Sequence, residues 1–304
     1  MIWVMVFGVP LLGLIAAAAW WALWGRRRGG VTGAVAVIAC VAGCLGVLAD
    51  LLVRLWSGWS LLVPFASALP VYASYRDVRF VMPLVVGIAG LILLAFPVRS
   101  RKGSGRADLT RRSPVSFARP RWFVLPAALA GLVVLLTLVA GMASTRDEVT
   151  GRYTAYVVDG GVGFVGTSIY GWFYSVPSLI ALAVLGLVAV TDLVLIARPA
   201  MGDDAMRDAA VRRLRTRNVL TVTSGALLLH LAAILSDLAG VASLRAGIAT
   251  SEGTALMWTP FAALHPVLTW SSQLAVMCGI AAWATVALTA IPSRRHVPVT
   301  VAAP

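Results

Sequence analysis

Five ionisable side chains lie within or at the edge of the long apolar runs of this sequence, and they are the first candidates for chemistry. They comprise three aspartates and two histidines: Asp50, Asp192, Asp237, His230 and His265. Burial of an ionisable group among apolar neighbours is costly, so such groups often line a path for protons, cations or polar solutes. The same groups can instead hydrogen-bond to one another and hold helices together. The sequence leaves both roles open.

The spacing of the two histidines and one aspartate predicts that they lie close together. Thr223, His230 and Asp237 recur every seven residues, which places them on one face of a helix. In an antiparallel pair of helices, positions whose residue numbers have a constant sum lie at equal depth. We therefore expect Asp237 to lie level with His265, and His230 to lie level with Gln273 about 10 Å deeper, from the helical rise per residue.

These residues define a predicted polar seam in the outer half of a helical bundle. Its members are Asp50, His230, Asp237, His265 and Gln273. Arg54 could join the seam, although Asp50 and Arg54 are four residues apart and can pair with each other on one helix. Asp192 lies near the opposite end of its apolar run, close to the lipid headgroups, and we expect it to be structural.

Other familiar constellations do not support a catalytic or cofactor site. The three histidines of the chain belong to no HExxH or paired Cys/His pattern, so the sequence has no zinc signature. His230 and His265 differ too much in expected depth to be axial ligands of one haem. Residues 161–166 match GxGxxG, but no βαβ unit surrounds them, and a glycine-rich hairpin turn is the better interpretation. We expect no catalytic residue, no cofactor and no metal.

The composition shows what kind of structure must position these side chains. Sixty per cent of the 304 residues are hydrophobic and 12% are charged, which excludes an ordinary soluble domain. The alternating runs of about 10 residues that form a transmembrane barrel are missing. The net charge of +13 does not indicate a nucleic-acid partner, because the basic residues cluster at the ends of apolar runs. We expect them to contact anionic lipid headgroups at the arginine-rich inner face of a bilayer.

Seven apolar runs are predicted to be membrane-spanning helices. They lie at about 2–24, 31–53, 80–98, 122–143, 175–197, 218–241 and 264–291. The first run is followed by three arginines, whereas a secretory signal peptide carries its positive charge before its apolar core, so we expect an uncleaved anchor. Loss of this run to the surface would leave six spans with both termini inside. The prediction is an all-α, polytopic transmembrane helical bundle that forms one domain over residues 1–292.

Charge asymmetry predicts the orientation of this bundle. Residues 99–121 carry eight cationic side chains and one acid, so this loop should stay cytoplasmic. Together with 26–28, 198–217 and 294–295, the predicted inner side holds 19 basic residues and the outer side holds six. The N-terminus is then outside and the C-terminus inside, with a cytoplasmic surface helix at 198–217 and a cytoplasmic tail at 293–304. Because 24 of the 25 basic residues are arginine, we expect a GC-rich bacterial source and the inner, or plasma, membrane.

The spans after the first form three out-and-back hairpins of similar length. They cover residues 31–98, 122–197 and 218–292. Asp50 and Asp237 occupy matching positions in the first and third hairpins, but the middle hairpin has a glycine there. A threefold repeat and three unrelated hairpins therefore both stay possible.

Two predicted outer loops have recognisable composition. The loop at 55–79 holds tryptophans and tyrosines typical of a membrane interface. The loop at 144–174 is predicted to hold a strand at 152–158, a turn at 159–161 and a return strand at 162–165.

Three functions are compatible with this layout. The leading hypothesis is a non-catalytic accessory or scaffold subunit of a membrane complex, with a membrane-protein partner, because the spans contain few polar residues and no set of them meets active-site geometry. The second is a small-solute or proton-linked transporter that uses the polar seam. The third is a membrane-embedded lipid-modifying enzyme, which would need polar residues that converge at the level of the headgroups.

Overall fold

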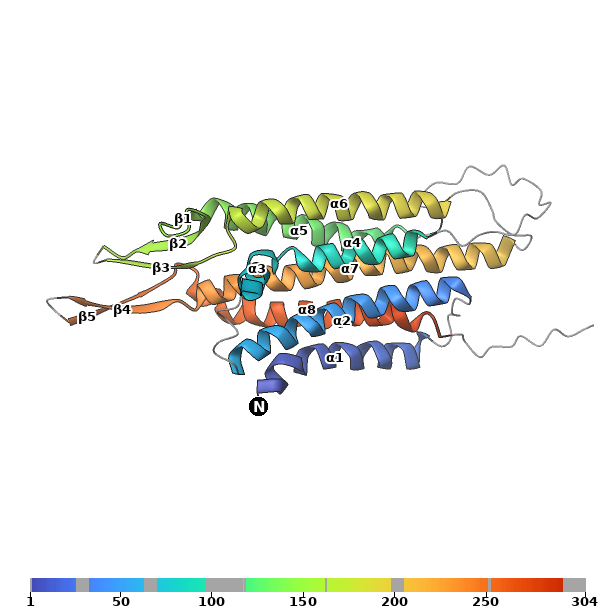
Figure 1. The fold of residues 1–304 in the computed structure, drawn as a ribbon, viewed down its shortest axis with the longest axis horizontal. Coiled ribbons are helices and arrows are strands. Elements are labelled where there is room, and N and C mark those ends of the chain that lie inside the picture. Colours follow the sequence, from blue (N-terminus) through green and yellow to red (C-terminus); the bar gives the residue numbers. More distant parts are fainter. Residues whose placement is uncertain are drawn as a thin grey trace, which may run out of the picture.

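The protein is a bundle of long helices with small β-sheets at one end (Figure 1). The computed structural model describes residues 2–25, 33–62, 70–96, 117, 119–161, 163–197, 205–250 and 253–291. Within these residues the α-helices are α1 (Ile2–Leu23), α2 (Ala34–Leu62), α3 (Pro70–Val78), α4 (Met82–Ala95), α5 (Arg121–Ala143), α6 (Trp172–Ala197), α7 (Ala205–Ala242) and α8 (His265–Leu288).

Six of the described helices are long and apolar enough to cross a membrane. They are α1, α2, α5, α6, α7 and α8. Each has at least 22 residues, whereas about 20 residues of α-helix span the hydrocarbon core. These helices make the chain an all-α, multi-pass membrane protein.

The predicted span at 80–98 differs from the other six. Its described part is α4, whose 14 residues cover about 21 Å at the helical rise and fall short of a bilayer core of about 30 Å. α4 packs one face against α2, α6 and α7, with Leu84 and Leu91 fully buried, and its opposite face, with Val85 and Ile92, is exposed. The helix begins at Met82 because Pro83 is favourable in a first helical turn. Among its described residues the structure thus has six helices long enough to span a membrane and, in α4, a shorter apolar helix beside them.

Two further boundaries differ from the sequence prediction. α2 continues to Leu62, so Trp56 lies on a helix and not in a loop. α7 is one helix of 38 residues, which joins the predicted surface helix at 198–217 to the predicted span at 218–241. No glycine or proline lies between the two segments to end the first helix. Most of the predicted loop at 99–121 and all of the tail at 293–304 lie outside the described residues.

α7 is the centre of the bundle, and a buried indole fixes how its neighbours approach. α7 contacts α2, α4, α5, α6 and α8. The side chain of Trp283 on α8 is fully buried. Its ring fits only because the nearest residues on three other helices are glycines: a β-carbon at Gly90 would lie 2.8 Å from its Cη2 atom, and one at Gly225 would lie 2.9 Å from its Cδ1 atom. Gly46 on α2 is packed against the same ring.

The predicted helical hairpins are packed pairs in the structure. α2 packs on α4, α5 on α6, and α7 on α8. Common ancestry of the three pairs stays a prediction.

Two small antiparallel sheets lie at the same end of the bundle (Figure 1, left). The first has the order β1-β2-β3, with β1 at Thr145–Arg146, β2 at Tyr153–Asp159 and β3 at Phe164–Ser168. The GxGxxG match begins in the β2–β3 turn and continues into β3, and Gly161 adopts a positive φ of 75° in the turn, which favours glycine. The second sheet pairs β4 (Arg245–Thr250) with β5 (Gly253–Trp258) and was not predicted from the sequence.

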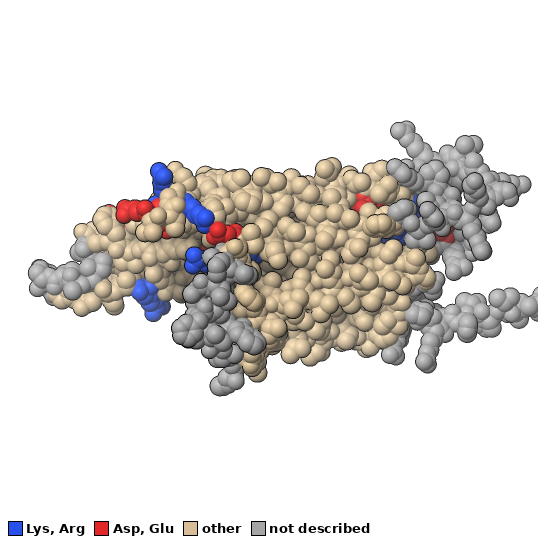
Figure 2. All heavy atoms as spheres, viewed as in Figure 1, with Lys and Arg blue, Asp and Glu red and all other residues tan. Residues whose placement is uncertain are grey.

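The two ends of the bundle are named by these features. The hairpin end carries β1 to β5. The arginine end, opposite to it, carries the described basic residues Arg119, Arg121, Arg212, Arg213, Arg215 and Arg217. In Figure 2 the coloured charges gather toward the two ends, and a broad band of uncharged surface separates them. This pattern suits a bundle whose long axis runs across a bilayer.

Candidate functional site

Three residues of the predicted seam line a cavity of about 540 Å³ at the hairpin end. α2, α7 and α8 form much of its wall, together with the residues that link α3 to α4. Its charged and amide-bearing lining residues are Asp50, Arg54, Arg79, Asp237 and Gln273. Three seam members thus share one cavity, whereas His230 and His265 are not among its lining residues.

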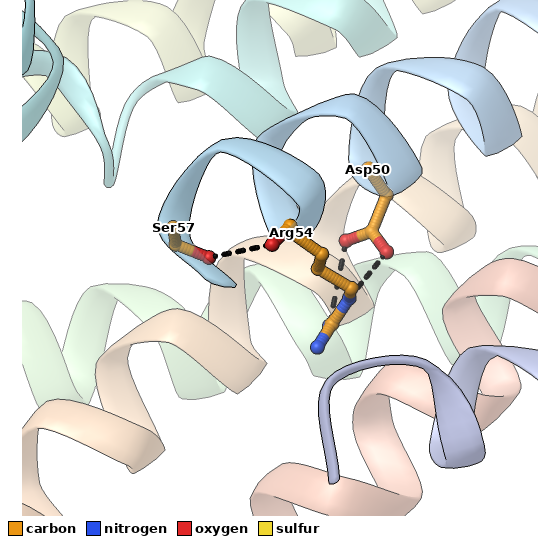
Figure 3. Close-up of polar contacts among 3 residues, drawn as sticks. All are labelled: Asp50, Arg54 and Ser57. Atoms are coloured by element: carbon orange, nitrogen blue, oxygen red, sulfur yellow. Dashed lines mark hydrogen bonds and ion pairs between the residues drawn. The ribbon is translucent and has the colours of Figure 1, made fainter. Parts of the chain in front are cut away.

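Asp50 and Arg54 form one ion pair on the wall of this cavity (Figure 3). The Arg54 Nε atom donates a hydrogen bond of 2.6 Å to Asp50 Oδ2, one turn earlier on α2. The Ser57 hydroxyl donates to the Arg54 carbonyl at 3.1 Å in the last part of the same helix. Both charges belong to one helix, so the pair balances the charge of α2 without joining it to another element.

Arg79 and Asp237 form a second ion pair, which does join two elements. Arg79, between α3 and α4, donates from Nη2 to Asp237 Oδ1 on α7 at 2.8 Å. The Asp237 side chain is only 11% exposed. Two polar atoms of the pair, Arg79 Nε and Asp237 Oδ2, have no hydrogen-bond partner within the described residues. The pair therefore retains one donor and one acceptor beside the cavity.

His230 lies next to the cavity but is tied to the backbone. Its side chain is fully buried, and its Nδ1 atom is 2.7 Å from the Phe80 carbonyl oxygen. Because a carbonyl only accepts, Nδ1 carries the proton and Nε2 is left as an acceptor. Nε2 has no partner in the part of the chain that the structure describes. With Arg79 and Asp237, this bond gives the α3–α4 link two adjacent anchors on α7.

His265 and Ser272 fix the register between α7 and α8. His265 Nδ1 lies 2.9 Å from the Ala239 carbonyl, and the Ser272 hydroxyl donates to the Ala232 carbonyl at 2.9 Å. In both pairs the residue numbers sum to 504. The pairs expected to lie at equal depth, Asp237 with His265 and His230 with Gln273, have sums of 502 and 503, so the observed register is close to the predicted one. Gln273 is exposed on the cavity side, and no hydrogen bond joins it to His230.

Asp192 lies away from the seam, toward the arginine end of α6. It is 1% exposed, and neither of its carboxylate oxygens has a hydrogen-bond partner among the described residues. Arg215 is the cation whose charge acts on it, but Arg215 donates hydrogen bonds to the Leu94 and Phe96 carbonyls.

Sequence reasoning missed Arg79, because its partner is 158 residues away along the chain and Arg79 was assigned to an outer loop. One feature of the sequence could have pointed to Arg79: it lies directly before an apolar helix. An arginine there can reach an acid on a neighbouring helix without leaving the interface.

The chemistry open to this cavity is polar binding. Two carboxylates and two guanidinium groups give its wall no net charge, and each carboxylate already has an arginine partner. Within the described ranges no three His, Cys, Asp or Glu residues group together in a way that could hold a metal ion. The cavity therefore suits a small solute with both donor and acceptor groups.

No protein-family model matches the chain, and it has no significant similarity to a curated protein or to a solved structure. A proposal for the function must therefore be argued from the geometry of the two ends of the bundle.

Proposed function

We propose that the protein is a non-catalytic accessory or scaffold subunit of a membrane complex. The observation that carries this proposal is the apolar surface of the two β-hairpins, which stand beyond the helices at the hairpin end (Figure 1). Three of their large apolar side chains are mostly exposed: Phe164 at 72%, Leu256 at 70% and Trp258 at 59%. Exposed large apolar side chains on projecting hairpins are typical of a surface that another protein covers.

The β2–β3 and β4–β5 hairpins together form what we call the platform. Contacts between the two hairpin regions hold it together. Met257 on β5 is buried, and its side chain packs so closely on Gly160 that a β-carbon there would collide with it. The Tyr156 and Phe261 rings also meet edge to face, with centroids 5.8 Å apart. β3 is an edge strand of its sheet, so its outer side has backbone groups that a partner strand could pair with. We assign as partner an apolar extended segment of a second membrane protein.

The charge distribution supports an orientation for this platform. The arginine end and the basic segments next to it in sequence hold most of the cationic residues, so we place that end in the cytoplasm. The hairpin end and the N-terminus are then outside, and the C-terminus is inside. A bacterial plasma membrane is the proposed location.

The polar seam has a structural role in this proposal. Asp50 pairs with Arg54, and Asp237 pairs with Arg79. His230 and His265 each bond to a backbone carbonyl of another element. Such bonds join helices in lipid and need no transported solute to explain them.

The test is purification of the full chain at native expression with its partners. We expect a stable partner to co-purify with the wild type and to be lost with Phe164→Ser/Leu256→Ser. The matched control is Val149→Ser, because Val149 is even more exposed but lies outside both hairpin strands. A wild-type chain that purifies alone, or a control that loses the partner equally, would contradict the proposal.

A small-solute transporter is the second candidate function, favoured by one observation. Asp237 Oδ2 and Arg79 Nε lack partners in the described part of the chain, and both residues line the cavity of about 540 Å³. In proteoliposomes, a transporter would show proton-coupled dye response or uptake that Asp237→Asn abolishes at unchanged folded yield. Asp77→Asn is the control, since Asp77 pairs with Arg152 outside the cavity. Loss of yield with Asp237→Asn, with no flux in the wild type, would leave only the structural role.

A further inference from the structure

A second cavity, of about 730 Å³, lies at the arginine end and has a different character. α1, α5, α7 and α8 all contribute to its wall. Its cationic lining residues are Arg119, Arg121, Arg213 and Arg217. Tryptophans 20, 21 and 122 complete much of the wall, and no Asp or Glu is among the described residues that line it. Four positive charges thus face one space without a balancing acid from its wall.

The basic cavity continues into an apolar groove of about 670 Å³. The two spaces share Trp20, Arg121, Trp122 and Arg217, so they form one cleft. Small and apolar residues line the rest of the groove, including Ala16 and Ala17 on α1 and Ala281 and Ala282 on α8. α1 packs on α8 and α5 packs on α7, so the groove lies between α1 and α5 over the α7–α8 pair.

The length of the groove matches one leaflet of a bilayer. Along α7 its lining runs from Arg217 to Leu228. Eleven helical steps correspond to about 16 Å, and half of a bilayer hydrocarbon core is about 15 Å. A ligand with its charged group among the arginines would therefore have room for an acyl chain at the depth where acyl chains lie.

The arginines of α7 divide into two sets with different tasks. Arg212 donates to Asp208 at 2.7 Å and also to the Ile196 carbonyl, and Arg215 donates to the Leu94 carbonyl at 3.0 Å. These two hold helices together. Arg213 lines the basic cavity and makes no hydrogen bond or ion pair with any described residue, and the same holds for Arg121. Arg217 lies over the Trp20 ring at 4.8 Å, which orients it at the junction of cavity and groove.

We propose that this cleft is a binding site for one anionic phospholipid. The phosphate group lies among Arg119, Arg121, Arg213 and Arg217, because guanidinium groups donate paired, charge-assisted hydrogen bonds to phosphate oxygens. An acyl chain lies in the apolar groove, and Trp20 and Trp122 sit at the level where tryptophan is favourable in membranes. A free phosphate would use the arginines but not the groove. This site is independent of the accessory role proposed above.

The experiment is native mass spectrometry of the full chain in detergent, with phosphatidylglycerol or phosphatidylcholine added as the probe. We expect one phosphatidylglycerol to bind in preference to phosphatidylcholine. Arg121→Gln/Arg213→Gln should weaken phosphatidylglycerol binding about 30-fold, from the usual contribution of each cation at a membrane surface. The matched control is Arg146→Gln/Arg245→Gln, which removes the same charge at the hairpin end and should leave binding unchanged.

A second pair of variants separates a lipid from a small anion. Ala16→Phe puts a ring into the groove from an exposed position of α1, and it should reduce phosphatidylglycerol binding. Ala18→Phe, also exposed but not part of the groove, should not. Equal binding of the two lipids, equal losses in the two arginine double variants, or full displacement by inorganic phosphate with Ala16→Phe unaffected would each overturn the proposal.

Discussion

The two ends of the bundle each hold a cavity lined by arginine, but they differ in how the charge is balanced. At the hairpin end, Arg54 and Arg79 each bond to an aspartate that lines the same space. At the arginine end, no acid is among the described residues that line the cavity. The first arrangement is complete within the chain. The second has no balancing acid among its described lining residues, and we infer that the difference separates a site that holds helices together from a site that binds an anionic ligand.

The largest expected effect tests the unbalanced end. Phosphatidylglycerol at a free concentration 100 times its dissociation constant should stabilise the wild type by about 2.7 kcal/mol, by mass action. Arg121→Gln/Arg213→Gln should lose most of this gain while its stability without lipid stays within about 0.5 kcal/mol of the wild type, as is usual for surface substitutions. Denaturant unfolding in detergent with and without lipid measures both quantities. A double variant that is much less stable without lipid would mean that these arginines are structural, as at the hairpin end.

The next effect tests the balanced end. Arg79→Ala leaves Asp237 nearly buried without its cation, and we expect a loss of about 2 kcal/mol, between the values typical of exposed and buried pairs. Arg79→Ala/Asp237→Ala should recover part of the loss, because no unpaired charge then remains. The free energy of unfolding of the two single variants and the double variant gives the coupling. Additive losses would show that the pair contributes nothing and that the comparison of the two ends is wrong.

A smaller loss is expected when the neutral anchor beside this pair is removed. His230→Leu deletes the bond to the Phe80 carbonyl and leaves that buried acceptor unpaired, which should cost about 1 to 3 kcal/mol less the gain from apolar burial. Hydrogen exchange of the amides around Phe80 should rise with it. Thr221→Leu also replaces a polar side chain with leucine, but in the groove at the other end of the bundle. It should leave amide hydrogen exchange around Phe80 unchanged. If both variants behave alike, His230 is not a specific anchor of the α3–α4 link.

The smallest expected effect concerns acid pH and one carboxylate at the hairpin end. Hydrogen bonds from the Thr150 and Val149 backbone N–H groups lower the pKa of the exposed Asp147 carboxylate. Because the folded pKa lies below the unfolded one, the stabilising contribution is present above the unfolded pKa and is lost as the pH falls through the folded pKa. The protection factors of the Val149 and Thr150 amides against hydrogen exchange should therefore decrease below about pH 4. Asp147→Asn should remove this pH dependence, and a variant that retains it would show that another group is responsible.

The sequence predicted the helices well where length and hydropathy decide the structure. Long apolar runs correspond to α1, α2, α5, α6 and α8, and the antiparallel register of α7 and α8 followed from residue numbers alone. α4 was predicted as a full span because its residues are apolar, but apolar composition does not fix where a helix begins and ends, and α4 has only 14 residues. The β4–β5 hairpin was missed because its sequence shows little alternation of apolar and polar residues.

Pairs between distant segments were the least predictable part of the site. Nothing in the sequence connects Arg79 with Asp237, since only the packing of α4 on α7 brings them together. The sequence does indicate which arginines of α7 line the cavity and which bond to backbone carbonyls. Arg213 and Arg217 are four residues apart and share one helical face, whereas Arg212 and Arg215 share another. Once α7 is known to be helical through this region, that spacing separates the cavity arginines from those that bond to backbone carbonyls.

The glycine-lined indole of Trp283 has a consequence for how the two ends can communicate. Gly90 of α4 and Gly225 of α7 touch opposite parts of one rigid ring, so a slide of either helix by one turn would bring a side-chain carbon into it. The middle of the molecule therefore resists the axial shift that would couple an opening on one side of the membrane to a closing on the other. An event at the hairpin end would have to reach the cleft at the arginine end by a tilt or rotation of whole helices about this ring.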